Sequence, residues 1–182
     1  MSSVAIEKVS PSVDDIYIFD TNILLMLFYP MMNDRKNAAY ENLYAKIICA
    51  KSKIIISSLQ ISEFINQCIR FQFKLYVKSN GIDIEFKKEY RATEDYREKM
   101  QAILEIVEND ILSVCQMVDD GFSRMKKEQL FIYGFSYDFN DAFISEVARI
   151  NNAKIVTNDV DYANYLKDNI VISANKGILL FK

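Results

Sequence analysis

The sequence predicts an α/β fold in which helices cover both faces of a parallel central sheet, in three layers. Short apolar segments rich in strand-forming residues alternate with segments of helical periodicity, which is typical of a parallel sheet. The apolar run at residues 16–19 ends abruptly at Asp20, as a buried parallel strand does. Half of the 182 residues (51%) are hydrophobic and only 4 are Gly and 2 Pro, so the chain can bury a full core.

The same patterns predict the individual elements. Apolar runs predict strands, and apolar residues repeating every three to four positions predict helices. The unpatterned residues 1–12 are expected to be disordered. Strands are expected at residues 16–19, 53–57, 154–157 and 170–173, with an edge strand at 178–181, and helices at 23–29, 34–50, 59–76, 93–118, 138–151 and 160–167.

The whole chain, residues 1–182, is expected to form a single domain. Approximately residues 80–134 differ from the rest, because Asn80-Gly81 marks a turn and charged residues then interleave with aromatic ones. No Pro- or Ser-rich linker bounds this segment. We therefore interpret it as a helical insertion within the domain.

The composition excludes several kinds of chemistry. The chain has no histidine, which removes Ser-His-Asp and Cys-His catalytic systems and the HExxH zinc site. Its 3 cysteines are scattered, so they are expected to be reduced thiols of a cytoplasmic protein. The longest apolar run, residues 23–32, is too short to span a bilayer, and no membrane association is expected. Carboxylates with hard metal ions remain as the chemistry of a hydrolase.

Acidic residues follow the predicted strands, at the edge of the sheet where functional groups of α/β folds collect. Asp20 ends the first strand, Glu63 lies in the first turns of the helix after the second, and Asp159 follows the strand at 154–157. Asp161 and the helix residue Asp141 complete the set. Carboxylates gathered at one edge would repel each other, and a cation such as Mg²⁺ or Mn²⁺ relieves that repulsion. The net charge of −3 is compatible with RNA but does not point to it.

These residues also carry a family resemblance. The segments IFDTN, ISSLQISEF, DFNDAFISEVA and IVTNDVDY resemble, in this order, the motifs of PIN-domain nucleases. The resemblance covers residues 15–78 and 136–173 and implies a Rossmann-like sheet. Many members of that family are endoribonucleases, including toxins of type II toxin–antitoxin pairs. The resemblance implies catalytic and metal-binding roles for Asp20, Glu63, Asp141 and Asp159, an auxiliary acidic role for Asp161, and positioning roles for Asn22 and Thr157.

Structural roles compete with these functional ones. Asp20 could cap the helix that follows it, and Glu63 could be an ordinary solvent-facing residue. Asp138 has the spacing of an N-cap for the helix that carries Asp141. Of Asp159 and Asp161, one is expected to cap the next short helix and the other, Asp159, to bind metal. Asn140 has either a structural role or a contact with substrate.

The basic and aromatic residues of the central segment allow two interpretations, one functional and one structural. Its lysines and arginines could contact phosphates, although solvated helix surfaces account for most such residues. Its tyrosines could stack on bases, although packing between the insertion and the core is the stronger expectation. The residues concerned are Lys87, Lys88, Arg91, Lys126, Lys127, Tyr90, Tyr133 and Tyr137.

The leading hypothesis is a divalent-metal-dependent endoribonuclease using Mg²⁺ or Mn²⁺, acting on RNA as the toxin of a toxin–antitoxin pair. An antitoxin protein and a second copy of the chain are then the expected partners. The first alternative is a catalytically silent PIN-fold scaffold that binds other proteins. The second is a phosphatase with Asp20 as nucleophile. Haloacid-dehalogenase-like phosphatases have a second Asp two residues later, and Asn22 at that position weakens this alternative.

Overall fold

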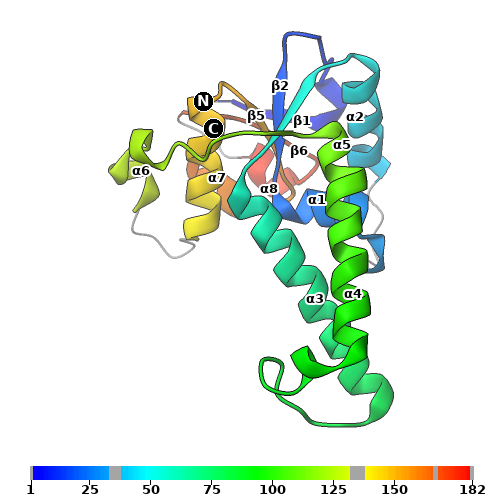
Figure 1. Ribbon diagram of the computed structural model, residues 1–182. Coiled ribbons are helices and arrows are strands. Elements are labelled where there is room, and N and C mark those ends of the chain that lie inside the picture. Colours follow the sequence, from blue (N-terminus) through cyan, green and yellow to red (C-terminus); the bar gives the residue numbers. More distant parts are fainter. Residues whose placement is uncertain (1, 33–37, 132–137, 166–167, 181–182) are drawn as a thin grey trace.

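The computed structural model describes residues 2–32, 38–131, 138–165 and 168–180. Its centre is a six-stranded sheet in the order β1-β6-β5-β2-β3-β4, in which every neighbouring pair is parallel (Figure 1). The strands are β1 (Ser2–Ala5), β2 (Ile16–Phe19), β3 (Lys53–Ile56), β4 (Gln116–Met117), β5 (Lys154–Val156) and β6 (Ile170–Ser173). The predicted α/β fold with a parallel central sheet is confirmed.

Side chains of successive strand residues point to opposite faces of the sheet, and each face has its own core. Tyr17 and Phe19 of β2 face one layer, which contains α1 (Thr21–Phe28), α2 (Ala38–Cys49) and α3 (Ser58–Asn80). Ile18 faces the other layer, built mainly from α7 (Phe139–Ile150) with α8 (Lys176–Leu179). The apolar strands are thus covered on both faces, which gives the three-layer α/β/α arrangement.

The position of β2 in the sheet creates the place where functional groups gather. Strand β2 pairs with β3 on one side and with β5 on the other. The strands that follow β2 in the chain therefore lie first on one side of it, as β3 and β4, and then on the other, as β5 and β6. In open parallel sheets, such a switch point leaves a crevice beyond the carboxyl ends of the strands. Phe19 pairs with Val156, and the backbone N–H of Asp20 then donates to the Val156 carbonyl at 2.9 Å. This register places Asp20 beside Thr157.

The start of α3 is tied to the end of β2 by one buried side chain. The Gln60 amide donates to the carbonyl of Phe19, and its oxygen accepts from the backbone N–H of Ser57 at 2.9 Å and from the Ser57 hydroxyl. Gln60 is fully buried. This capping arrangement fixes the first turn of α3, and therefore Glu63, relative to the residue before Asp20.

Helix α3 continues far beyond the sheet and forms an arm with α4 (Glu94–Ile106), which packs against it in the opposite direction (Figure 1). Gly81, with φ of +61°, ends α3 at the predicted Asn80-Gly81 turn. At the free end of the arm, Tyr90 is fully buried and packs against Phe73 and Phe86. Tyr90 therefore packs inside the arm and is not available to stack on bases. Tyr133 and Tyr137 lie outside the described residues.

Two predictions at the chain ends are wrong. The segment expected to be disordered forms β1, which pairs with β6, and is followed by the buried residues Ile6 and Val9. Residues 178–180 of the expected edge strand are not a strand. Lys176–Leu179 is the helix α8, whose N-cap Asn175 accepts from the Gly177 N–H at 2.9 Å. Because β1 already occupies the edge beside β6, no second strand can pair there.

The predicted helix at 93–118 is right for most of its length and wrong at its end. It consists of α4, a π-helical turn at Val107–Ile111 and the short α5 (Leu112–Val114). Gln116 and Met117 then pair with Ile55 and Ile56 of β3 as the edge strand β4. The helix expected at 160–167 is a 3₁₀ helix at Val160–Tyr165.

All three cysteines are free, with Cys68 and Cys115 buried and Cys49 exposed. Among the helices in the described ranges, none has the length and apolar character that crossing a membrane requires.

Replacement of Gln60 tests the link between β2 and α3. The change Gln60→Ala leaves the Phe19 carbonyl and the Ser57 N–H unpaired in a buried place, and each such group costs about 1–3 kcal/mol. We expect the free energy of unfolding, measured by urea denaturation, to fall by roughly 2–5 kcal/mol. The control Gln101→Ala, at an exposed position on α4, should change it by less than about 0.5 kcal/mol. Equal stabilities of the two variants would contradict this role for Gln60.

Candidate active site

Asp20 is the most deeply buried of the acidic residues at the switch point, with 5% of its surface exposed. The Thr157 hydroxyl donates to its Oδ2 at 2.7 Å, and the Tyr162 hydroxyl donates to its Oδ1 at 3.3 Å. Although Asp20 occupies the N-cap position of α1, its side chain makes no capping hydrogen bond. The structure thus orients the carboxylate toward β5 and the turn that follows β5, away from the role of a helix cap.

Thr157 connects Asp20 to the turn that carries two further acids. Its Oγ1 accepts from the backbone N–H of Asp159 at 2.9 Å while its hydroxyl donates to Asp20. Asp159 Oδ1 in turn accepts from the N–H of Asp161 at 3.0 Å, which caps the start of the 3₁₀ helix. The sequence predicts metal binding by Asp159 and leaves the cap to Asp161; this assignment of the cap is wrong, because Asp159 makes it. Its carboxylate and that of Asp161 both face the site described next.

Asp141 approaches the same turn from α7. The cap of that helix is Asp138, whose Oδ1 accepts from the Asn140 N–H at 2.7 Å, as its spacing predicted. Asp141 is left free of the capping role. One carboxylate oxygen from each of Asp141, Asp159 and Asp161 lies within 4.8 Å of the other two. We call these three residues the acidic cluster.

Glu63 reaches the site from α3 and is held by two neighbours. The Thr21 hydroxyl donates to its Oε2 at 2.7 Å, and the Gln67 amide donates to its Oε1 at 3.2 Å. The side chain is half-buried, so the solvent-facing alternative does not describe it. Because Thr21 follows Asp20 directly in the chain, the bond from Thr21 keeps Glu63 near the end of β2.

The pKa values indicate that these carboxylates share one electrostatic environment. Burial raises the pKa of Asp20 to about 7, with the charges of Asp159 and Glu63 adding to the effect. Burial also raises the pKa of Asp141 to about 8, reinforced by the charges of Asp20, Asp138, Asp159 and Glu63. Proximity of like charges favours protonation of one partner. The charges of the four acids expected to act together thus influence one another, but among the described residues only Asp141 and Asp159 of these four belong to the acidic cluster, and Asp20 and Glu63 lie outside it.

The remaining predicted residues have different surroundings. Asn22 lies in the first turn of α1, and its buried Oδ1 has no hydrogen-bond partner among the described residues. Asn140 lines a hollow beside α3 together with Glu63. Sequence reasoning missed Thr21 and Tyr162, which hold Glu63 and Asp20. Both stand next to singled-out acids, in DTN and VDY, but nothing in a single sequence distinguishes a hydroxyl that supports a carboxylate from one that faces solvent.

The donor set fits a hard divalent cation. The predicted ligands Asp20, Glu63, Asp141, Asp159 and Asp161 offer only carboxylate oxygens, which Mg²⁺ and Mn²⁺ prefer. Among the residues that the structure describes, none of these five forms an ion pair with Lys or Arg. Ion pairs within the described residues therefore do not balance the negative charge of the site, and a cation would balance it.

Comparison with known proteins agrees with this arrangement. The sequence pattern of the PIN domain family matches residues 17–167, which include every acid of the site. The chain belongs to the PIN domain family. Proteins with PIN domains are generally nucleases, and their acidic residues typically hold divalent metal ions. No curated protein matches this PIN domain in sequence.

Two solved structures share the fold of this PIN domain. One is VapBC2 from Rickettsia felis, bound to a DNA fragment from their promoter, with 21% identity and a TM-score of 0.50, covering 87% of this chain and 98% of the other. The second is FitAcB from Neisseria gonorrhoeae, with 11% identity and a TM-score of 0.51, covering 87% and 96%. At these identities the likeness shows the fold alone.

The raised pKa of Asp20 predicts how stability depends on pH when a chelator removes divalent ions. Between its ordinary value of 3.8 and about 7, the folded protein keeps a proton on Asp20 that the unfolded chain has lost. Stability therefore falls as pH rises through this window. Asp20→Asn does not titrate. We therefore expect the free energy of unfolding of Asp20→Asn, measured by urea denaturation, to rise relative to that of the wild type as pH increases from 4 to 8. The expected change in the difference is on the order of 3 kcal/mol. Parallel pH profiles of the two proteins would show that Asp20 ionises normally.

Proposed function

We propose that this PIN domain is a divalent-metal-dependent endoribonuclease that hydrolyses RNA phosphodiester bonds. The observation that carries the proposal is the convergence of Asp141, Asp159 and Asp161 within 4.8 Å, with no basic side chain of the described residues paired to them. Membership in a family of nucleases supports the same reaction class. The ion is Mg²⁺ or Mn²⁺, because both prefer carboxylate oxygen.

Each residue of the site has a proposed role that follows from its position. Asp141, Asp159 and Asp161, with Asp20 and Glu63, are the proposed ligands, directly or through water. A bound divalent ion supplies Lewis acidity at the phosphate and lowers the pKa of water, a role that no histidine can take in this chain. Thr157 and Tyr162 hold the Asp20 carboxylate in one orientation. The unpaired Asn22 Oδ1 is a further oxygen available to orient ligand or substrate.

The substrate proposal follows from access to the site. Asp159 is exposed, and Asp141 and Asp161 are half-buried, so a phosphate must approach the acidic cluster from the surface. A single strand or a loop of RNA has a backbone flexible enough to bring a phosphate to such a surface, and we therefore propose it as the substrate. We expect products with 5′-phosphate and 3′-hydroxyl ends.

We also propose that the protein acts as the toxin of a toxin–antitoxin pair. The motif resemblance to type II toxins supports this, and so does the shared fold with VapBC2 and FitAcB. The DNA fragment in the VapBC2 structure belongs to that protein's own promoter. An antitoxin protein partner, and a homodimer of this chain, are parts of the same proposal.

Cleavage of a labelled RNA in the presence of Mn²⁺ tests the proposed reaction. We expect Asp20→Asn and Asp141→Asn to lose more than about 100-fold in kcat/KM, beyond the 10–100-fold typical for altering an outer-shell partner. Thr21→Val removes only the hydrogen bond to Glu63 and is expected to lose roughly 10–100-fold. Asp138→Asn is the matched control, because asparagine can keep the cap of α7. If Asp141→Asn cut RNA as fast as Asp138→Asn, the proposed site would be wrong.

Calorimetric titration with Mn²⁺ separates the nuclease from a silent scaffold. Metal ligands bind as deprotonated carboxylates, so an ion that binds near Asp20 and Asp141 must displace protons. With pKa values of about 7 and about 8, these two acids should release roughly 1.4 protons at pH 7 and almost none at pH 9. Titrations in two buffers with different ionisation enthalpies measure this number. A scaffold would give no binding heat at millimolar Mn²⁺.

A further inference from the structure

A groove runs along α3, away from the acidic cluster. It has a volume of about 430 Å³ and is lined by Glu63, Asn66, Gln67, Arg70 and Lys74 of α3 and by Asn140 of α7. We call it the α3 groove. The helical residues recur every three to four positions, so they lie on one face of α3. Glu63 stands at the end near the active site, and Lys74 lies roughly 16 Å further along the helix axis.

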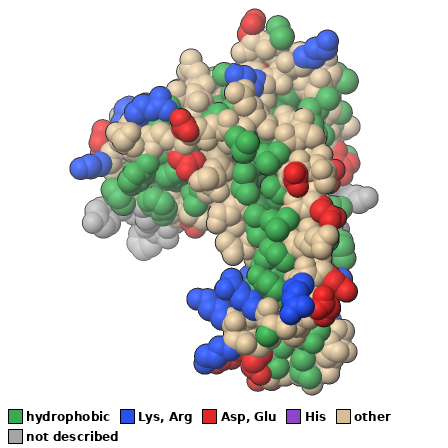
Figure 2. All heavy atoms as spheres, in the orientation of Figure 1, with side chains coloured by type: hydrophobic (Ala, Val, Ile, Leu, Met, Phe, Trp, Pro, Cys, Tyr) green, Lys and Arg blue, Asp and Glu red, His purple; other side chains and the backbone are tan. Residues whose placement is uncertain are grey.

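The charge along this groove changes sign with distance from the active site. Arg70 and Lys74 are both exposed, and in the described part of the chain neither forms an ion pair with an acidic residue. Two other cations on the arm are paired, Lys88 with Glu85 and Arg97 with Glu94, whereas Lys78, Lys87, Arg91 and Lys99 form no ion pair among the described residues. Figure 2 shows Lys and Arg side chains gathering near the free end of the arm, on the α3 side. The groove thus joins an acidic end to a basic one.

Arg70 is held in place by the loop at the end of the arm. Its guanidinium lies over the ring of Phe86, 4.2 Å from the ring centre, and Arg91 approaches the same ring at 5.5 Å. Phe86 itself is buried against Phe73, in the aromatic core of the arm. A planar guanidinium stacked in this way keeps its N–H groups available to donate to two oxygens of a phosphate. Because stacking on Phe86 already holds the Arg70 guanidinium in place, less side-chain entropy is lost when it binds a phosphate than for an unstacked arginine.

We infer that the α3 groove binds the backbone of single-stranded RNA on one side of the scissile phosphate, with Arg70 and Lys74 contacting successive phosphates. The inference rests on the proposed nuclease function and adds to it the path of the substrate. Arg70 and Lys74 are one helical turn apart, about 6 Å along the axis. The polar side chains of Asn66 and Asn140 line the same groove, and Asn140 precedes Asp141 of the acidic cluster in the chain. The phosphates of an RNA strand are evenly spaced anions. A strand with one phosphate at the acidic cluster would place later phosphates beside Arg70 and Lys74.

Binding of a fluorescent ten-nucleotide oligouridylate, measured by anisotropy, tests the inference. All variants are made in the Asp20→Asn protein with Mg²⁺ present, so that cleavage does not interfere. We expect Arg70→Gln and Lys74→Gln each to weaken binding several-fold. The slope of log Kd against log salt should fall by about 0.7 for each lost phosphate contact on a single strand, and by about 1.4 in the double variant. Arg70→Lys keeps the charge but loses the stacked plane, and should keep the wild-type slope while binding more weakly.

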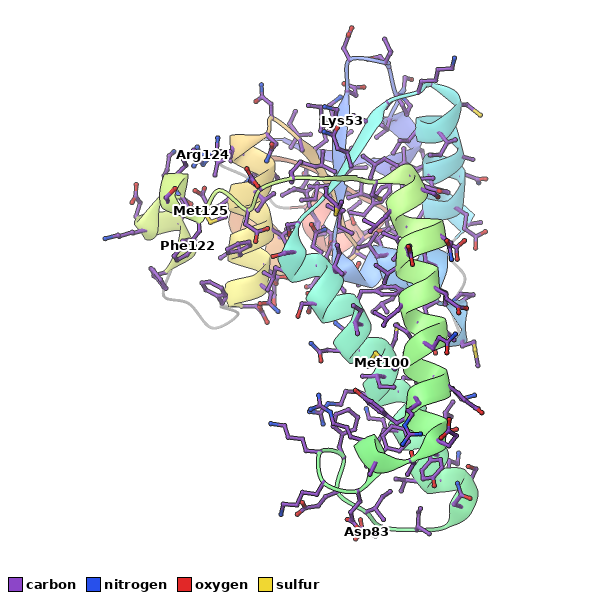
Figure 3. All side chains as sticks on the ribbon, viewed as in Figure 1. Lys53, Asp83, Met100, Phe122, Arg124 and Met125 are labelled. Atoms are coloured by element: carbon purple, nitrogen blue, oxygen red, sulfur yellow. The ribbon has the colours of Figure 1, made fainter. Side chains whose placement is uncertain are left out.

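Lys53→Gln is the matched control. Lys53 is exposed, lies in no ion pair among the described residues, and stands at the end of the molecule opposite the arm, where Asp83 marks the free end (Figure 3). It should leave affinity and salt slope unchanged. The inference is overturned if the double variant binds the oligonucleotide like the parent, or if Lys53→Gln weakens it equally. It is also overturned if an acidic peptide occupies the groove in preference to the oligonucleotide.

Failure of this inference is distinguishable from failure of the proposed function. The wild-type protein and Asp20→Asn are compared for RNA cleavage in Mn²⁺, and that comparison does not involve Arg70 or Lys74. If the wild type cuts and the groove variants bind normally, the nuclease proposal stands and the substrate follows another path. If neither protein cuts RNA but the groove variants lose affinity as described, the groove is an RNA-binding surface without the proposed reaction.

Discussion

The parallel pairing of β2 with β5 is the constraint on which the candidate site depends. Its register brings the residue after Phe19 next to the residue after Val156, so that Asp20 and Thr157 form a 2.7 Å hydrogen bond. Thr157 then accepts from the N–H of Asp159 and thereby fixes the turn that carries Asp159 and Asp161. A shift of one residue in this pairing would turn Asp20 to the opposite face of the sheet. The site therefore depends on the sheet register before it depends on any single acid.

That register gathers carboxylates that repel one another, and no ion pair among the described residues offsets the repulsion. Asp20 is buried among hydroxyl donors and near other carboxylates, and the pKa of Asp20 and of Asp141 rises as a consequence. Hydrogen bonds from the Thr157 hydroxyl and the Thr21 backbone favour the charged form of Asp20 but leave its pKa raised. Buried charges are stable when they are paired or coordinate metals. No Lys or Arg of the described residues pairs with the acids, and this is the physical reason for expecting a cation.

Helix α3 connects the sheet, the acidic site and the arm in one continuous element. Gln60 anchors its first turn to β2, Glu63 reaches the site one turn later, and Arg70 lies two turns beyond Glu63 on the same face. A rigid helix keeps these residues at fixed distances. The aromatic packing around Tyr90 and Phe86 stabilises the free end of the arm and positions Arg70. The proposed substrate path is thus built on the same helix that carries a proposed ligand.

The sequence by itself predicted the central strands, most of the helices, and the acids at the strand ends, because buried strands and amphipathic helices have local apolar patterns. It also predicted the cap at Asp138, since that bond joins residues two apart. Only the tertiary structure decided that β1 and β4 are edge strands and that Lys176–Leu179 is helical. Strands β1 (sequence SSVA) and β4 (sequence QM) lack the apolar run that marks the central strands, and they exist through their partners. Tertiary structure likewise decided that Thr21 holds Glu63 and that Tyr162 holds Asp20. Those bonds join residues 42 and 142 positions apart, and hydrogen bonds at such separations follow from sheet register, which no local pattern records.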